Sequence, residues 1–330
     1  MHSNRIACVV VVSITAMLSA AGLACAQSGG APAWPQRTVK IVTPQPAGTA
    51  IDTGLRLVAD RLAKRWGQGV IVENRPGGDG VLATVSFIQA KDDHALLGSP
   101  GYPFTIAPSV LDKLPYDPVA DVTPITLMFE TPLMVAATKG LAANSMAELE
   151  KLGKAEPGKL NWASTAGLPN FAFNFFVKSK GLDMAYVPYR DAASPLNDIG
   201  EGRIQIYVTS YGTVMPQLEA GKIKVLALLT EQRIGIAPEV PTVAEAGYPD
   251  MKVIGFSGLF GIKDMPAALR ERIAADITAI AREADVKDLM EKNVQVARGS
   301  TAAEFVKVLD EQRTQVGAML KATGQGKKAP

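Results

Sequence analysis

The loop Gln45–Asp52 carries residue types that can hold a small anion, and no catalytic group is set into it. Gly48 lets a ligand approach the backbone, Thr49 offers a hydroxyl, and Asp52 or Thr53 can cap the helix that follows. The start of a helix exposes unpaired N–H groups and carries positive potential, which suits a carboxylate or a phosphate. A plain turn between a strand and a helix is the alternative interpretation. The candidate ligand-binding residues of this loop are Gln45, Ala47, Gly48, Thr49 and Asp52.

A second loop of the same kind closes a later strand and leads into a helix over residues 171–180. Its hydroxyls and backbone N–H groups predict contacts with the opposite face of the same anion. Ser99 and Thr209 each close a further strand, where either could contact a ligand or simply form a turn. Arg190 could pair with a carboxylate, and a solvated arginine at a strand end is the alternative. The candidates in the second loop are Ser164, Thr165, Gly167 and Asn170.

The sequence offers little to a catalytic site. It contains no G-x-S-x-G elbow, no H-E-x-x-H pair and no G-x-G-x-x-G dinucleotide motif. The stretch Arg75–Gly80 lacks the Lys-Ser/Thr of a phosphate loop and therefore predicts a tight turn. His94 begins a strand with no nucleophile nearby, which favours a structural histidine. We expect no catalytic residue, no metal and no cofactor.

The first residues form a predicted signal peptide over residues 1–26, so the protein is expected to be secreted. Arg5 supplies a positive charge, residues 6–23 are apolar, and Ala24-Cys25-Ala26 provides a cleavage signature. The short apolar run carries Ser and Thr, which argues against a membrane anchor, while a lipid anchor at Cys25 stays open. Cys8 and Cys25 both lie in this leader, so we expect no disulfide and no thiolate nucleophile in the mature chain.

Apolar strand-like runs alternate with helical segments, which predicts an α/β fold. The runs are almost continuously apolar, as is typical of strands that are covered on both faces. Leu55, Val58, Leu62 and Trp66 recur near the 3.6-residue period and predict a helix after the first strand. The predicted strands span residues 38–44, 70–74, 95–99, 133–138, 160–164, 185–189, 204–210 and 224–229.

Length and charge limit the organisation and the partners. The net charge is +2, and no Lys/Arg run forms a patch, so we expect no nucleic-acid partner. Roughly three hundred mature residues exceed what one core usually holds, which predicts two domains. The first is predicted to comprise residues 34–130 and 254–330, and the second residues 131–253. A cleft between two such domains is a natural ligand site.

Several different short motifs occur along the chain in a specific order and spacing. They are Trp34-Pro35, Pro46-Ala-Gly48 with Asp52, Val72-Glu-Asn-Arg-Pro-Gly77, Leu114-Pro-Tyr-Asp-Pro118, Pro157-Gly-Lys-Leu160, Val187-Pro-Tyr189, Ala220-Gly-Lys222, and Arg233 with Pro241-Thr-Val-Ala-Glu-Ala-Gly247. In this combination the chain resembles the extracytoplasmic solute-binding proteins of the tripartite tricarboxylate transporter system, the TctC-like or Bug family. The resemblance runs from Trp34 nearly to the C-terminus.

The resemblance implies a two-lobed periplasmic binding fold, type II-like, that closes on a small carboxylate in the interdomain cleft. It implies that the loops 46–52 and 164–170 face each other across that cleft. It also implies a monomer in the periplasm whose partners are the membrane permease subunits of a tripartite transporter. The chain departs from the family pattern, and these departures predict a smaller or more polar solute than an aromatic acid. Where the family commonly has Phe, Gly, His, Glu and Asp, this chain has Gln45, Thr49, Asn170, Asn174 and Thr209.

The sequence thus predicts a periplasmic solute-binding protein that captures a small organic anion by hinged closure and delivers it to a permease. A periplasmic sensor that feeds a two-component system is the second hypothesis, and it differs in the surface that meets the partner. A periplasmic hydrolase is the third, and its activity would depend on Ser164 or His94.

Overall fold

The computed structural model describes residues 34–165, 167–189 and 193–324. The chain divides into two units, Met1–Gln36 and Arg37–Pro330, and the second unit carries every helix and strand named below. The predicted signal peptide lies outside the described residues. None of the helices in the described part of the chain combines the length and the apolarity needed to span a membrane.

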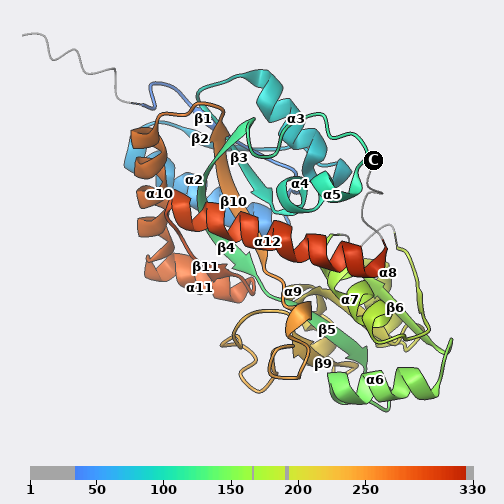
Figure 1. The fold of residues 1–330 in the computed structure, drawn as a ribbon. Coiled ribbons are helices and arrows are strands. Elements are labelled where there is room, and N and C mark those ends of the chain that lie inside the picture. The colour runs from blue at the N-terminus through green and yellow to red at the C-terminus, as the bar shows by residue number, and fades with distance from the viewer. Residues whose placement is uncertain (1–33, 166, 190–192, 325–330) are drawn as a thin grey trace, which may run out of the picture. The chain divides into compact units, whose positions relative to one another are not determined.

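A mixed six-stranded sheet is built from four strands before residue 132 and two strands after residue 254, in the order β11-β4-β10-β3-β1-β2 (Figure 1). β1 pairs in parallel with β2 and β3, whereas β10 is antiparallel to both β3 and β4. Its strands are β1 (Val39–Thr43), β2 (Val70–Asn74), β3 (Ala95–Pro100), β4 (Val122–Thr131), β10 (Gly255–Ile262) and β11 (Val296–Ala297). The associated helices are α2 (Ala50–Trp66), α3 (Val81–Ala90), α4 (Tyr102–Thr105), α5 (Ala107–Val110), α10 (Ala267–Ala281), α11 (Ala284–Lys292) and α12 (Ala302–Thr323).

A second, five-stranded sheet has the order β7-β6-β8-β5-β9. β6 runs parallel to β7 and β8, and β5 is antiparallel to β8 and β9. The ends of β6 and β8 therefore lie at the same edge as the start of β5. Its strands are β5 (Leu133–Thr138), β6 (Leu160–Ser164), β7 (Met184–Tyr186), β8 (Ile206–Ser210) and β9 (Ile223–Leu228). The helices between them are α6 (Met146–Ala155), α7 (Leu168–Ser179), α8 (Ala193–Gly200) and α9 (Tyr211–Glu219).

Each sheet has an aromatic-rich core. Beside the first sheet, Phe104 stacks on Phe260 with ring centroids 4.1 Å apart, and Phe260 contacts Phe305 of α12. Beside the second, Trp162 packs against Phe173, whose ring centroid is 5.0 Å away. Each of these rings is almost completely buried, and burial of such a side chain contributes roughly 1.5–3 kcal/mol. These two cores hold the strand ends, which carry the site, in fixed positions.

α12 contributes side chains to both cores. It contacts β4 and α4 beside the first sheet and α7 beside the second (Figure 1). Its residue Leu309 belongs to the core around Phe260, whereas Val316 and Met319 belong to the core around Phe173. The assignment of residues 254–330 to the first domain stays a prediction, and α12 shows that this segment also packs against α7 in the core beside the second sheet.

All eight predicted strands are present, with bounds that differ by three residues or fewer. The helix predicted from the stripe of apolar residues is α2, in which Leu55, Val58 and Leu62 are buried. The sequence analysis missed β4, β10 and β11. β10 has the sequence GFSGLFGI, and its three glycines weaken the continuous apolar pattern that identified the other strands.

Candidate functional site

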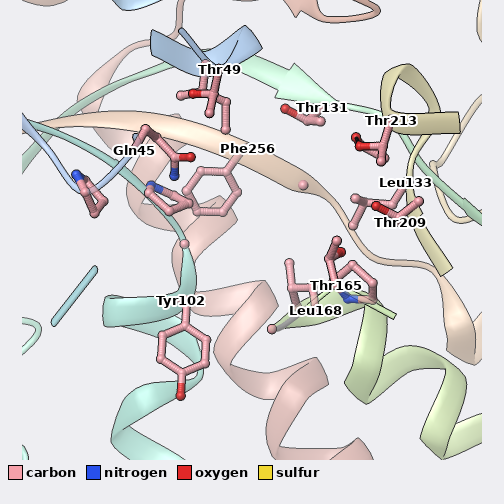
Figure 2. A pocket seen from close by; sticks show the side chains of 18 of the residues that line it. Gln45, Thr49, Tyr102, Thr131, Leu133, Thr165, Leu168, Thr209, Thr213 and Phe256 are labelled. Carbon is pink, nitrogen blue, oxygen red and sulfur yellow. Dashed lines mark hydrogen bonds between the residues drawn. The ribbon is translucent and has the colours of Figure 1, made fainter. Parts of the chain in front are cut away.

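A pocket of about 990 Å³ is lined by residues from both sheets and from the loops at their edges (Figure 2). Its walls include the N-cap residues of three helices, namely Thr49 of α2, Gly167 of α7 and Ser210 of α9. The N-terminus of a helix presents N–H groups and positive potential to whatever lies in front of it. The pocket is therefore suited to an anion even though its lining is poor in basic side chains.

The first predicted loop folds through Thr49, which caps α2, so the prediction that Asp52 or Thr53 caps this helix is wrong. The Thr49 hydroxyl accepts a hydrogen bond from the Asp52 backbone N at 3.3 Å and donates one to the Pro46 carbonyl at 3.0 Å. Gly48 has a φ of +81°, in the left-handed region that residues with a Cβ rarely adopt. The turn therefore depends on glycine at this position, and both Thr49 and Gln45 line the pocket.

Asp52 holds this loop in shape through hydrogen bonds of its carboxylate. Its side chain is only 2% exposed, and its Oδ2 accepts hydrogen bonds from the Gly48 N at 2.9 Å and from Arg56 Nε at 2.9 Å. Its Oδ1 accepts one from Asn74 Nδ2 at 2.7 Å. Burial alone would raise the pKa of Asp52, but the hydrogen bonds from Arg56, Asn74 and Gly48 outweigh it and lower the pKa. Asp52 is thus an ionised anchor for the loop.

Asn74 completes this anchor, and the sequence analysis gave it no role. Its Nδ2 donates both to Asp52 and to the Gln45 carbonyl, the latter at 2.9 Å. The register of β1 and β2 pairs Thr43 with Asn74, which brings Asn74 to the edge where the loop begins. A polar residue at the end of the neighbouring parallel strand was the signal that could have identified it.

The second predicted loop is held by its own residues in the same way. Asn170 Nδ2 donates to Ser164 Oγ at 3.0 Å, and the Thr165 N donates to the Val208 carbonyl at 3.1 Å. Gly167 caps α7 with a φ of +83°. Thr165 and Gly167 line the pocket, whereas Ser164 and Asn170 bond to each other behind it.

The structure brings five of the eleven predicted ligand-binding residues to the pocket wall. These are Gln45, Thr49, Thr165, Gly167 and Thr209. The six others do not line it in the described part of the chain, and a ligand contact by any of them stays a prediction: Ala47, Gly48, Asp52, Ser99, Ser164 and Asn170. Ser99 is fully buried and donates to the Pro100 carbonyl at 3.1 Å. Arg190 lies outside the described residues.

Several lining residues were not predicted from the sequence. Thr131 ends β4, a strand that the analysis missed, and its hydroxyl is buried without a partner among the described residues. Gln295 is 2% exposed, and its amide has no hydrogen-bond partner there either. That amide lies under α2, since a Cβ on Gly54 would stand 3.3 Å from Gln295 Oε1. Thr213 and Phe256 also line the pocket (Figure 2).

Charge is sparse around the pocket. Among the described residues that line it, the charged ones are Asp79 and Lys292, and both are exposed. Tyr102 also lines the pocket, and burial, together with the negative charge of Asp79, raises its pKa. A phenol with a raised pKa stays protonated at neutral pH and can donate a hydrogen bond. An anion in this pocket would be held mainly by dipoles and hydroxyls.

A group of acidic residues with a histidine occurs elsewhere, at Asp92, Asp93 and His94. Arg37 pairs with both carboxylates, at 2.6 Å from Asp92 and 2.8 Å from Asp93. His94 is 5% exposed and bonds to Asp93 through Nδ1 at 2.8 Å. These ion pairs account for the group structurally, and none of its members lines the pocket.

The sequence and the fold are both similar to those of known proteins. The model of the tripartite tricarboxylate transporter family receptor matches residues 55–325. A UPF0065 protein in the tcbD-tcbE intergenic region of Pseudomonas sp. (strain P51) is 28% identical over 313 residues, covering 91% of this chain and 92% of the relative. The structure of R. palustris Rpa4515 with adipate has a TM-score of 0.78 at 24% identity, covering 88% of this chain and 99% of the other.

A second solved structure has the same fold. MatC (Rpa3494) from Rhodopseudomonas palustris with bound malate has a TM-score of 0.73 at 24% identity, covering 87% of this chain and all of the other. The two-sheet α/β architecture is therefore the fold of these structures, and the structure of the periplasmic binding protein BugD shares it, with a TM-score of 0.74 at 24% identity over 89% of this chain and all of the other. With the family match over residues 55–325, the resemblance seen in the short motifs is confirmed. This chain belongs to the tripartite tricarboxylate transporter receptor family.

Proposed function

We propose that this protein captures a small organic carboxylate in the pocket and delivers it to the permease subunits of a tripartite transporter. The observation that carries the proposal is that the N-cap residues of three helices, Thr49, Gly167 and Ser210, line one pocket. Each helix N-terminus stabilises a nearby anion by roughly 0.3–1 kcal/mol, and more where the site is partly buried. The adipate and malate of the two R. palustris structures are ligands of this chemical class.

Capture would involve hinged closure and no covalent chemistry. The chain passes between the sheets where β4 ends at Thr131 and β5 begins at Leu133, and again on entering β10 at Gly255. All three of these residues also line the pocket, so a ligand contacts the segments that must bend. The family is one of receptors, and we infer that the protein acts as a monomer in the periplasm after removal of its leader.

A thermal-shift screen of the mature protein tests the ligand class. The panel contains adipate, malate, succinate and glutarate, with glucose and glycerol as neutral solutes. A ligand present at about 100 times its Kd stabilises the folded form by about 2.7 kcal/mol, which is roughly 5 °C in Tm for a chain of this size. We expect at least one carboxylate to give such a shift. A shift with a neutral solute and with none of the carboxylates would overturn the proposal.

Two matched glycine variants test the site. Gly48→Ala and Gly67→Ala each place a methyl group in open space at a positive φ, +81° and +66°, on the two ends of α2. Each should cost about 1–2 kcal/mol of stability, because the left-handed region disfavours a Cβ. Only Gly48 belongs to the loop that lines the pocket, so only Gly48→Ala should weaken carboxylate binding. Equal Kd values for the two variants would mean that the loop is merely structural.

A further inference from the structure

Four threonines form one wall of the pocket, and we call them the threonine wall: Thr131, Thr165, Thr209 and Thr213. Figure 2 shows these four side chains on one side of the pocket, across from Gln45 and Phe256. They come from four elements, namely the end of β4, the residue after β6, β8 and α9. The sheet order β6-β8-β5 places the ends of β6 and β8 at the edge where β5 begins, and Thr131 at the end of β4 lies two residues before β5.

Two hydroxyls of the threonine wall have no partner among the described residues. Thr209 is 1% exposed, and its Oγ1 makes no hydrogen bond. The Oγ1 of Thr131 is buried and equally without a partner. A buried hydroxyl left unpaired costs roughly 1–3 kcal/mol, which makes two of them in one wall an unusual arrangement for folding alone.

Three buried threonines away from the pocket lining have hydrogen-bond partners within the fold. Thr84 and Thr105 each donate to the backbone carbonyl four residues earlier, both at 2.9 Å. Thr126 donates to the Ser300 carbonyl at 2.8 Å. These three threonine hydroxyls are therefore paired where they serve packing, whereas the buried Ser257 Oγ, away from the pocket lining, has no partner among the described residues. The unpaired hydroxyls of Thr131 and Thr209 are available to a group that enters the pocket.

The chemistry of the wall selects what can enter. A hydroxyl both donates and accepts, so it pairs with a hydroxyl or a carbonyl. A ligand that places an alkyl group against the threonine wall would leave Thr131 and Thr209 unpaired. A carboxylate buried against the wall would meet no cation in the wall itself. The lining cation Lys292 is exposed, where its charge is screened by solvent.

We propose that the threonine wall binds an uncharged oxygen of the solute, so that the ligand is a hydroxy- or oxo-carboxylate rather than an unsubstituted one. This inference rests on the proposed carboxylate-binding function. The N-terminus of α2, whose N-cap Thr49 belongs to the same loop as Gln45, would hold the carboxylate, and Thr131 and Thr209 would complete their hydrogen bonds with the substituent. Recognition by hydroxyls that are otherwise unpaired discriminates strongly, because the analogue lacking the oxygen leaves them unsatisfied.

Calorimetric titration with matched acids tests the inference. The pairs are succinate and malate, glutarate and 2-hydroxyglutarate, and butyrate and 3-hydroxybutyrate, which differ by one hydroxyl at equal charge. In the wild type we expect the hydroxylated member of at least one pair to bind about tenfold more tightly. The double variant Thr131→Val/Thr209→Val should reduce that ratio to about threefold or less, whereas Thr209→Ser, which keeps the hydroxyl, should preserve it.

The outcomes separate this inference from the function on which it rests. If carboxylates bind but both members of every pair bind equally, or if the valine variants leave the ratio unchanged, the threonine wall is not a recognition surface and the proposed function stands. If no carboxylate binds, both fall. Each single valine variant is titrated as well, so that the comparison survives poor folding of the double variant.

Discussion

Replacing Asp52 by asparagine should remove hydrogen bonds that hold the first loop of the pocket and should lower the free energy of unfolding. The carboxylate accepts hydrogen bonds at both oxygens, from Gly48 and Arg56 at one and from Asn74 at the other. An asparagine has one oxygen and one NH₂ group. In either orientation of the amide, the NH₂ group therefore faces a donor that the carboxylate had satisfied.

The loss of unfolding free energy in Asp52→Asn depends on which hydrogen-bond partners are lost. The less damaging orientation keeps Gly48 and Arg56 and loses the bond to Asn74, and it turns a charged acceptor into a neutral one. Hydrogen bonds to a charged group contribute about 1.5–3 kcal/mol and neutral ones about 0.5–1.5 kcal/mol. The Arg56 side chain is 49% exposed, so its pair with Asp52 adds little. Asp52→Asn should destabilise the protein by about 2–4 kcal/mol, or roughly 5–10 °C in Tm.

The pH dependence of this loss gives the sharper test. The pKa of Asp52 is lower in the folded protein than in the unfolded chain, where it is about 3.9. Its ionised form therefore stabilises the fold fully above that value, and the contribution is lost as the pH falls through the folded-state pKa. The difference in unfolding free energy between wild type and Asp52→Asn should be largest near about pH 7 and should shrink below about pH 4.

Denaturant unfolding at a series of pH values measures this difference, with Arg56→Gln as the control. That variant removes the half-exposed partner of Asp52 together with its exposed hydrogen bond to Asn74 Oδ1, and it should cost less than about 1 kcal/mol. Our account of the loop is refuted if Asp52→Asn is as stable as the wild type at neutral pH. It is refuted equally if the difference stays constant down to about pH 3, because an ionised carboxylate would then not be its source.

Two further substitutions test the core and the pocket wall. Gly258→Ala would drive a methyl group into the ring of Phe305 and should cost about 1–3 kcal/mol, whereas Gly140→Ala meets no atom within 4 Å and should be neutral or slightly stabilising; equal unfolding midpoints for the two would contradict this packing. Thr209→Val removes a buried hydroxyl that has no partner among the described residues and should raise the Tm of the unliganded protein by a few degrees, while a lower Tm would mean that the hydroxyl is paired.

The sequence predicted the positions of the strands well because buried strands of this fold are apolar almost without interruption. β8 and β5 are examples, in which nearly every residue is buried. The pattern fails for β10, whose glycines allow α12 to approach the sheet closely at Phe305. Without β10 and β4 the sequence could not place Thr131, because the edge that carries it is defined only by pairing between distant segments.

The predicted ligand-binding residues divide according to where their hydrogen-bond partners lie. Four of them have a hydrogen-bond partner within six positions of the chain, and their bonds shape the loops, but the residues do not line the pocket: Gly48, Asp52, Ser164 and Asn170. Capping and turn signals in a sequence are local, so they identify the loop correctly but do not distinguish a residue that builds it from one that contacts a ligand.

Thr209 is the opposite case, and it shows how the distinction can be made. It lies in β8, where adjacent side chains point to opposite faces of the sheet, so the side chains of Val208 and Ser210 cannot pair with its hydroxyl. A buried polar side chain in a strand must then find a partner across the sheet or in the pocket, and among the described residues Thr209 has none. Polar side chains that are left unpaired at the ends of buried strands, as at Thr131 and Thr209, therefore indicate the pocket wall in addition to the helix caps beside them. Thr209→Val should change the relative affinities for different acids, whereas Asp52→Asn should weaken the binding of every acid alike.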